Sequence, residues 1–441
     1  MKPIDIGLIL EAERSGPRLK FSVFLAALAV IFDGAEIQLL AVAIPSLMND
    51  WNLPRSAFAN VVASGLVGMM IGGALAGVAG DRLGRKVALL LSVLTFAGAT
   101  LAMATVQGLG SLGFLRFISG VGLGGAMPNA AALVAELVPR RQRAFAVTLT
   151  IVCVPIGGMV AGFVGSKVLP VLGWRGLFVL GGLAPLVCLL VQYAFLMESP
   201  RYLARRPRRW PELVALLGRA GHDVPAESTF TDSSEDTIAR VSVRALFAPD
   251  FWRDTVSLWV AFCACMLAVY SGFNWIPALL TGAGWGVASA SNGILYFNLG
   301  GVAGAIAAGL VISRFGSRPT MLVMALGAVG SAMVLARLTI SAHAPHFPVL
   351  AMLLITGGLI NALMVATYAL SAHVYPTAVR ATGLGAAVSV GRLGAVLSAG
   401  AGSWMLDKGG YPYFFAMMAG AMAVCFAGLA CIRRHIQRTE S

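Results

Sequence analysis

Residues 21–45 read FSVFLAALAVIFDGAEIQLLAVAIP, an almost wholly apolar run with two acids, Asp33 and Glu36, near its centre. A bilayer core is crossed by about 20 apolar helical residues, so this run is long enough to span one. The two acids are three positions apart and therefore share one face of the helix. Because a carboxylate facing lipid costs several kcal/mol, we expect that face to be turned toward protein or water.

This acidic pair is a candidate proton-coupling site. Burial and mutual repulsion both favour the protonated form, and two coupled carboxyls do not titrate independently. Ionisable groups in spanning helices are usually functional, so we expect Asp33 and Glu36 to take up and release a proton inside the membrane. The alternative is a pair of structural carboxyls that neighbouring helices satisfy.

The composition excludes a soluble protein. Of 441 residues, 58% are hydrophobic and only 12% are charged, which is typical of a polytopic helical membrane protein. The six cysteines lie in apolar segments and are interpreted as small buried side chains, not as disulfides or metal ligands. We find no nucleotide-binding loop and no nucleophile beside a base. The sequence therefore predicts neither an ATP-driven pump nor an enzyme, and no cofactor or metal.

The hydrophobic pattern predicts an all-α membrane protein with twelve spanning helices in two pseudo-symmetric six-helix bundles. The expected spans are roughly residues 20–47, 56–79, 86–106, 110–135, 142–166, 174–196, 254–281, 289–312, 319–340, 347–372, 382–405 and 411–432. An Arg- and Pro-rich stretch that turns acidic interrupts them. We therefore divide the chain into a tail (1–19), a first bundle (20–196), a linker (197–252), a second bundle (253–432) and a second tail (433–441).

The placement of positive charge predicts the orientation. Most of the 32 Lys and Arg residues fall in the tails, the linker and alternate loops, which the positive-inside rule assigns to the cytoplasm. Both termini are therefore expected to be cytoplasmic, in a multi-pass protein of the plasma membrane (the bacterial inner membrane). The net charge of +13 is interpreted as this topology signal and not as a nucleic-acid-binding surface.

Two cytoplasmic loops of the first bundle have counterparts in the second. GDRLGRK (80–86) follows the second span and ISRFGSR (312–318) follows the eighth. ELVPRRQRA (136–144) follows the fourth span and HVYPTAVRA (373–381) follows the tenth. Matching loops at matching places indicate duplication of a six-helix unit.

At these loops the chain resembles the major facilitator superfamily over nearly all its length. GDRLGRK is similar to the superfamily's signature between helices two and three. RFISGVG (116–122) is similar to its Arg-x-x-x-Gly-x-Gly in helix four, and ESPRYL (198–203) to the end of its helix six. The resemblance implies a secondary transporter with the major facilitator fold.

A narrower resemblance is to the aromatic acid:proton symporter family. Asp33-Gly34-Ala35-Glu36 resembles that family's Asp-Gly-x-Asp, and residues 122–130, 375–383 and 391–392 are also similar. The resemblance implies import of aromatic carboxylates driven by protons. Two departures are Glu36 in place of the second aspartate, and Ser313 where the second-half loop often has an aspartate.

Two arginines, Arg116 and Arg392, lie deep in predicted helices. Arg392 is near the middle of the eleventh span, and its planar guanidinium suits a substrate carboxylate; a structural ion pair is the alternative. Arg116 is expected to hold the acids of the first helix or relay protons, with a packing role as the alternative. An aromatic acid also needs an apolar slot and a few polar contacts. Further candidates for substrate binding, each with interior packing as the alternative, are Tyr270, Asn274, Trp275, Asn298, Asn361 and Tyr368.

Charged residues in the cytoplasmic loops are candidates for an inner gate of salt bridges that holds the cytoplasmic side closed. The alternative is that they serve topology and surface solvation. The candidates are Asp81, Arg82, Arg85, Glu136, Arg140, Arg143, Arg314 and Arg380.

The sequence thus predicts a proton-coupled transporter that imports a benzoate- or hydroxybenzoate-like acid by alternating access. Its partners are expected to be the organic anion, protons and the lipid bilayer, with no nucleic acid, and the protein is expected to be a monomer. One alternative is a transporter of sugar acids, aliphatic organic acids or drugs. The other is a membrane sensor that transports nothing.

Overall fold

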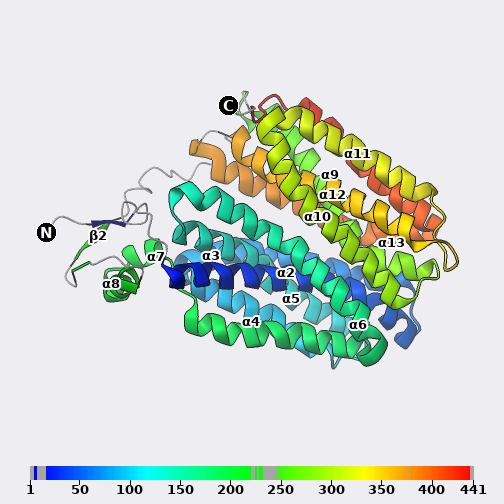
Figure 1. Cartoon of the computed structure of the whole chain (residues 1–441), viewed down its shortest axis with the longest axis horizontal. Helices are drawn as coiled ribbons and strands as arrows, with labels where there is room; N and C mark the ends of the chain where they lie inside the picture. Colours follow the sequence, from blue (N-terminus) through cyan, green and yellow to red (C-terminus); the bar gives the residue numbers. More distant parts are fainter. Residues whose placement is uncertain are drawn as a thin grey trace.

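The computed structural model describes residues 4–6, 16–219, 224–225, 228–231, 246–249, 251–375 and 377–437. Most of these described residues belong to long helices. Two groups of helices lie side by side, with α2 to α6 in one and α9 to α13 in the other (Figure 1), and we call them the first and second half. The helices are α2 (Pro17–Trp51), α3 (Ala59–Leu83), α4 (Arg85–Met103), α5 (Leu109–Leu137), α6 (Arg140–Phe195), α9 (Trp252–Gly282), α10 (Val287–Phe315), α11 (Ser317–Arg337), α12 (His346–Val374) and α13 (Thr377–Cys431).

Two of these helices are each a pair of spans. The backbone of α6 is not helical at Gly173, where φ is 63°, and that of α13 is not helical at Gly409 and Gly410, where φ of Gly410 is 67°. Positive φ is accessible to glycine without steric cost, so the chain can turn sharply there. Ten helices in the described part are long and apolar enough to cross a membrane. With α6 and α13 counted as two spans each, the described residues contain the twelve predicted spans.

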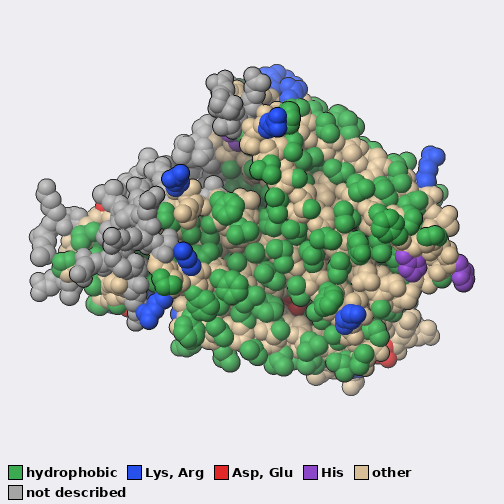
Figure 2. Space-filling view, in the orientation of Figure 1, with side chains coloured by type: hydrophobic (Ala, Val, Ile, Leu, Met, Phe, Trp, Pro, Cys, Tyr) green, Lys and Arg blue, Asp and Glu red, His purple; other side chains and the backbone are tan. Residues whose placement is uncertain are grey.

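The outer surface of the helical body is apolar. Large side chains such as Phe114, Leu190 and Val323 are 64%, 70% and 70% exposed. Hydrophobic side chains cover most of the face in Figure 2, and Lys and Arg lie mainly toward its edges. Such a continuous apolar surface suits lipid, in which the helices satisfy their own backbone hydrogen bonds.

Close crossings between helices depend on glycine. A Cβ on Gly34 of α2 would lie 2.1 Å from the Val154 carbonyl oxygen of α6, and one on Gly157 would lie 2.0 Å from the Ile31 carbonyl oxygen. No larger residue fits at this crossing without moving a backbone. Small residues at helix contacts are the usual device in membranes, where no hydrophobic effect drives helices together. This contact fixes the helix that carries Asp33 and Glu36 against α6.

A small folded unit lies at one end of the body, which we call the linker end; the opposite end is the far end. It comprises β1 (Ile4–Asp5), α7 (Pro200–Ala204), η2 (Pro207–Arg209), α8 (Trp210–Arg219) and β2 (Phe230–Thr231), with β1 and β2 paired in parallel (Figure 1). Ile6, Leu213 and Phe230 are among the residues of its own apolar core. The linker predicted at residues 197–252 thus contains a short helix, α8, whereas the strand pairing had no sequence signal.

Candidate functional site

Asp33 and Arg392 face each other across the two halves. Asp33 lies near the middle of α2, and Arg392 lies near the middle of the segment of α13 that precedes its break. The two side chains interact electrostatically. Asp33 is only 1% exposed, and its Oδ1 has no hydrogen-bond partner among the described residues. Buried polar atoms are nearly always paired, and an exception of this kind requires an explanation, of which a functional role is one.

The guanidinium of Arg392 reaches from the second half to the backbone of the first. Its Nη1 donates a hydrogen bond of 3.1 Å to the carbonyl oxygen of Met69 on α3. A Cβ on Gly73 of the same helix would lie 2.0 Å from that Nη1. The guanidinium therefore occupies a notch that exists because residue 73 has no side chain.

Glu36 has different surroundings from Asp33. Its Oε1 accepts hydrogen bonds from the Thr100 hydroxyl and, at 3.4 Å, from the Ser119 hydroxyl, and it pairs with Arg116 Nη1 at 3.5 Å. Arg116 also donates to the carbonyl oxygens of Glu36 and Ile37, at 3.2 and 2.8 Å. All these groups belong to α2, α4 and α5. Glu36 and Arg116 therefore belong to a hydrogen-bonded network inside the first half, in which only Arg116 Nε lacks a partner among the described residues, while Asp33 is directed toward the second.

Two tyrosines of the second half complete the surroundings of Arg392. Tyr270 on α9 interacts electrostatically with both Arg392 and Asp33, and Tyr368 on α12 interacts with Arg392. The Tyr270 hydroxyl donates to Met69 Sδ at 3.9 Å. Tyr368 packs edge-on against Phe262, with ring centroids 4.9 Å apart. Four of the residues predicted from the sequence (Asp33, Arg392, Tyr270 and Tyr368) thus come together between the halves.

The other predicted substrate residues lie in different settings. Asn274 is 4% exposed and its Nδ2 lacks a partner within the described residues. Asn361 donates to the Gly357 carbonyl oxygen of its own helix at 2.9 Å. The Trp275 indole donates to the Ser398 carbonyl oxygen at 3.2 Å, inside the second half, so its polar atom is already used in packing. Asn298 is hydrogen-bonded to Gln38, a residue that the sequence analysis did not single out.

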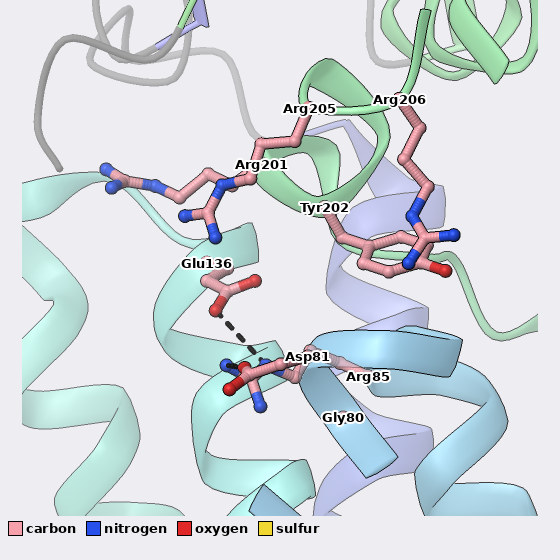
Figure 3. Close-up of a pocket in the computed structure, with 8 residues that line it drawn as sticks. All are labelled: Gly80, Asp81, Arg85, Glu136, Arg201, Tyr202, Arg205 and Arg206. Atoms are coloured by element: carbon pink, nitrogen blue, oxygen red, sulfur yellow. Dashed lines mark ion pairs between the residues drawn. The ribbon is translucent and has the colours of Figure 1, made fainter. Parts of the chain in front are cut away.

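At the linker end, Arg85 connects two acids of the first half. It pairs with Asp81 at 2.8 Å and with Glu136 at 3.5 Å (Figure 3). The Ser199 hydroxyl donates to Glu136, and the Tyr202 hydroxyl donates to the Arg82 carbonyl oxygen at 3.2 Å. These contacts surround a pocket of about 80 Å³. Its lining comes from the first half, α7 and the two residues that follow α7: Gly80, Asp81, Arg85, Glu136, Arg201, Tyr202, Arg205 and Arg206.

The remaining predicted gate residues contribute less to this cluster. The Arg314 guanidinium lies 5.6 Å from the centre of the Phe315 ring beside it. Arg143 is half-buried near the start of α6. The side chains of Arg140 and Arg380 lie outside the described residues. The structure therefore brings Asp81, Arg82, Arg85 and Glu136 together, with Ser199, Tyr202 and Arg206 as further members that were not predicted to belong to the gate.

A body of twelve apolar spans, with opposite charges facing each other between its halves, defines a multi-pass membrane transporter. The family model of the Major Facilitator Superfamily matches residues 26–344 and 294–440. The chain therefore belongs to the Major Facilitator Superfamily, a family of transporters whose fold has twelve helices in two bundles. This confirms the predicted fold class and the expectation of a transporter rather than an enzyme.

Curated relatives agree with the narrower resemblance. The chain is 32% identical to the gallate transporter of Pseudomonas putida, over 93% of this chain and 92% of the relative. It is 33% identical to the 4-hydroxybenzoate transporter PcaK of Acinetobacter baylyi, over 91% and 88%. Among solved structures, a D-xylose-proton symporter superposes with a TM-score of 0.70 at 19% identity, covering 92% of this chain and 97% of that one. At that identity the likeness supports the fold alone.

Proposed function

We propose that the protein is a proton-coupled transporter that imports an aromatic carboxylate by alternating access. The observation that carries the proposal is that the buried Asp33, whose Oδ1 has no hydrogen-bond partner among the described residues, lies within electrostatic range of Arg392 in the other half. One partner can bind a proton and the other can bind an anion. Relatives named for gallate, 4-hydroxybenzoate and benzoate support the aromatic substrate.

In this proposal Arg392 binds the substrate carboxylate. A guanidinium stays charged and presents parallel N–H groups that match both oxygens of a carboxylate. Tyr270, Tyr368 and Phe262 supply aromatic faces for the ring, and rings pack edge-to-face or offset at such distances. The Asn274 amide offers a donor for a ring substituent. We leave Trp275 out, because its indole N–H is bonded to Ser398.

Asp33 carries the transported proton. While Asp33 is ionised, it attracts the Arg392 guanidinium and competes with the substrate. Protonation removes that competition, so a carboxylate can pair with Arg392 and the net charge between the halves stays low. Glu36, held by Arg116, Thr100 and Ser119, anchors α2 to α4 and α5 and keeps Asp33 in place.

The transport cycle is a rocking of two bundles about this site, as in other transporters built from repeats. We assign residues 20–196 and 253–432 to the moving bundles, 197–252 to the linker, and 1–19 and 433–441 to the tails. We propose that the linker end is cytoplasmic and that both termini lie on the cytoplasmic side of the bacterial inner membrane; the concentration of Lys and Arg at the linker end supports this orientation. The Asp81–Arg85–Glu136 cluster lies within the first half, and we assign it to the first half's side of the inner gate; a monomer is sufficient for the cycle.

Uptake into proteoliposomes tests the proposal. Labelled 4-hydroxybenzoate should accumulate when the outside is made acidic, and an uncoupler should abolish accumulation. Labelled gluconate in the same vesicles distinguishes aromatic from sugar-acid transport. Accumulation that is the same with and without a proton gradient would contradict proton coupling. Binding of the ligand without any transport would indicate a sensor.

A further inference from the structure

Gln38 and Asn298 form a reciprocal amide pair between the two halves. Gln38 Nε2 donates to Asn298 Oδ1 at 3.1 Å, and Asn298 Nδ2 donates to Gln38 Oε1 at 2.7 Å. The residues lie on α2 and α10, 260 positions apart in the chain. Both side chains are fully buried. The pair therefore ties the halves together where solvent does not reach.

The pair lies on the far-end side of Asp33. Gln38 follows Asp33 along α2 toward the far end by about 7 Å of helical rise. Beyond it, Arg55 Nη2 of η1 (Arg55–Phe58) donates to the Ala278 carbonyl oxygen of α9 at 3.2 Å. Arg55 also interacts electrostatically with Asp407 at the end of a span of α13. Contacts between the halves thus continue from the amide pair to the far end.

Tight packing surrounds the pair. A Cβ on Gly158 of α6 would lie 2.2 Å from Gln38 Nε2 and 2.6 Å from Asn298 Cγ. A Cβ on Gly162, one turn further along α6, would lie 2.9 Å from the Leu295 backbone nitrogen of α10. The backbones of α6 and α10 therefore approach closely here, and any opening of the far end must separate α10 from both α6 and α2.

We propose that Gln38 and Asn298 are the gate residues of the far end, and that their paired amides hold this side of the transporter closed. Separating the amides leaves buried donors and acceptors unpaired unless water replaces the partner, which favours the closed arrangement. Because both groups are uncharged, the gate does not depend on pH, unlike the Asp33 site. Its use in transport rests on the proposed alternating-access cycle, but its test needs no substrate.

The test measures the distance between the halves at the far end. Spin labels are attached to cysteines that replace the exposed residues Ser56 and Lys408, one in each half, with Cys263 and Cys431 changed to serine. In the otherwise unaltered protein we expect one dominant short distance. Gln38→Ala and Asn298→Ala should each raise the ratio of long to short distances by roughly tenfold or more, since two buried hydrogen bonds are lost. The double variant leaves neither amide unpaired, so it should raise the ratio less than either single variant.

Gln192→Ala is the matched control. Gln192 is also a fully buried glutamine, but its Nε2 donates to the Leu25 carbonyl oxygen within the first half, at 3.0 Å. Its removal should leave the distances unchanged. If Gln38→Ala does not fold, Gly158→Ala forces the amides apart while keeping both. If the distance distribution of Gln38→Ala or of Gly158→Ala is the same as that of the control, the proposal is overturned. This outcome does not depend on whether the transported substrate is an aromatic acid.

Discussion

Asp33 and Glu36 lie one turn apart on α2, yet Glu36 is bound by three side chains and Asp33 Oδ1 by none in the described part of the chain. The two acids also belong to different interfaces. Glu36 pairs with Arg116 inside the first half, and Asp33 faces Arg392 of the second. When two carboxyls have such different environments, their roles are expected to separate.

Replacing Asp33 by asparagine should uncouple transport from protons. The introduced amide would imitate the protonated acid in shape and charge, so substrate binding and counterflow exchange should persist. Accumulation driven by a pH gradient should be lost. Both are measured in proteoliposomes, with exchange under equal pH on both sides as the internal control. Full proton-driven accumulation by Asp33→Asn would show that another group carries the proton.

Replacing Glu36 by alanine should reduce stability instead. The change leaves the buried Arg116 guanidinium without its counter-charge, and breaking a buried pair in this way costs about 3–5 kcal/mol. We therefore expect a clear fall in Tm of the purified protein in detergent. Asp33→Asn, on the same helix, serves as the comparison and should not lower Tm. Equal Tm values for the two variants would remove the distinction between anchor and proton carrier.

The fold could be predicted from sequence because lipid imposes a simple rule on each span. Runs of about 20 apolar residues locate the helices, and Asp33 and Arg392 are conspicuous because charge is rare within such runs. Family membership and the solved relatives confirm that architecture. The helix breaks at Gly173 and Gly410 fall between the predicted spans.

The partners of the site residues could not be predicted in the same way. Thr100 and Ser119 bind Glu36, and Gln38 binds Asn298. Uncharged polar side chains are tolerated in spanning helices, so Thr100, Ser119 and Gln38 do not stand out in the sequence. Their pairing depends on which helix faces meet, as does the different use of Asp33 and Glu36. The pairing of β1 with β2 likewise joins segments far apart in the chain.

Replacing Arg392 by lysine should weaken binding of the anion. Lysine keeps the charge but cannot offer two parallel N–H groups to a carboxylate. Since a charged hydrogen bond contributes about 1.5–3 kcal/mol, the Kd for 4-hydroxybenzoate should rise by about tenfold or more. Isothermal titration on the purified protein measures it. An unchanged Kd would mean that the carboxylate binds elsewhere.

Replacing Gly73 by alanine should displace Arg392 without touching it chemically. The added methyl would overlap the Arg392 Nη1 that donates to Met69, so uptake of the aromatic acid should fall severalfold or more. Gly77→Ala is the matched control, since a Cβ there meets nothing within 4 Å. Equal uptake by the two variants would show that the notch is not needed.

Glu198, between α6 and α7, should make stability depend on pH. Burial raises the pKa of its carboxyl above the ordinary value of 4.5, although Oε1 accepts hydrogen bonds from the backbone N–H groups of Lys86, at 3.0 Å, and Ser199, at 2.9 Å. Between 4.5 and the raised pKa, the folded state binds more protons than the unfolded state. Stability should therefore decrease as pH rises through that range. Glu198→Gln keeps the Oε1 acceptor but cannot ionise, so its Tm should vary less with pH than that of the unaltered protein. A steeper fall of Tm with rising pH in the glutamine variant would contradict a burial-raised pKa at this position.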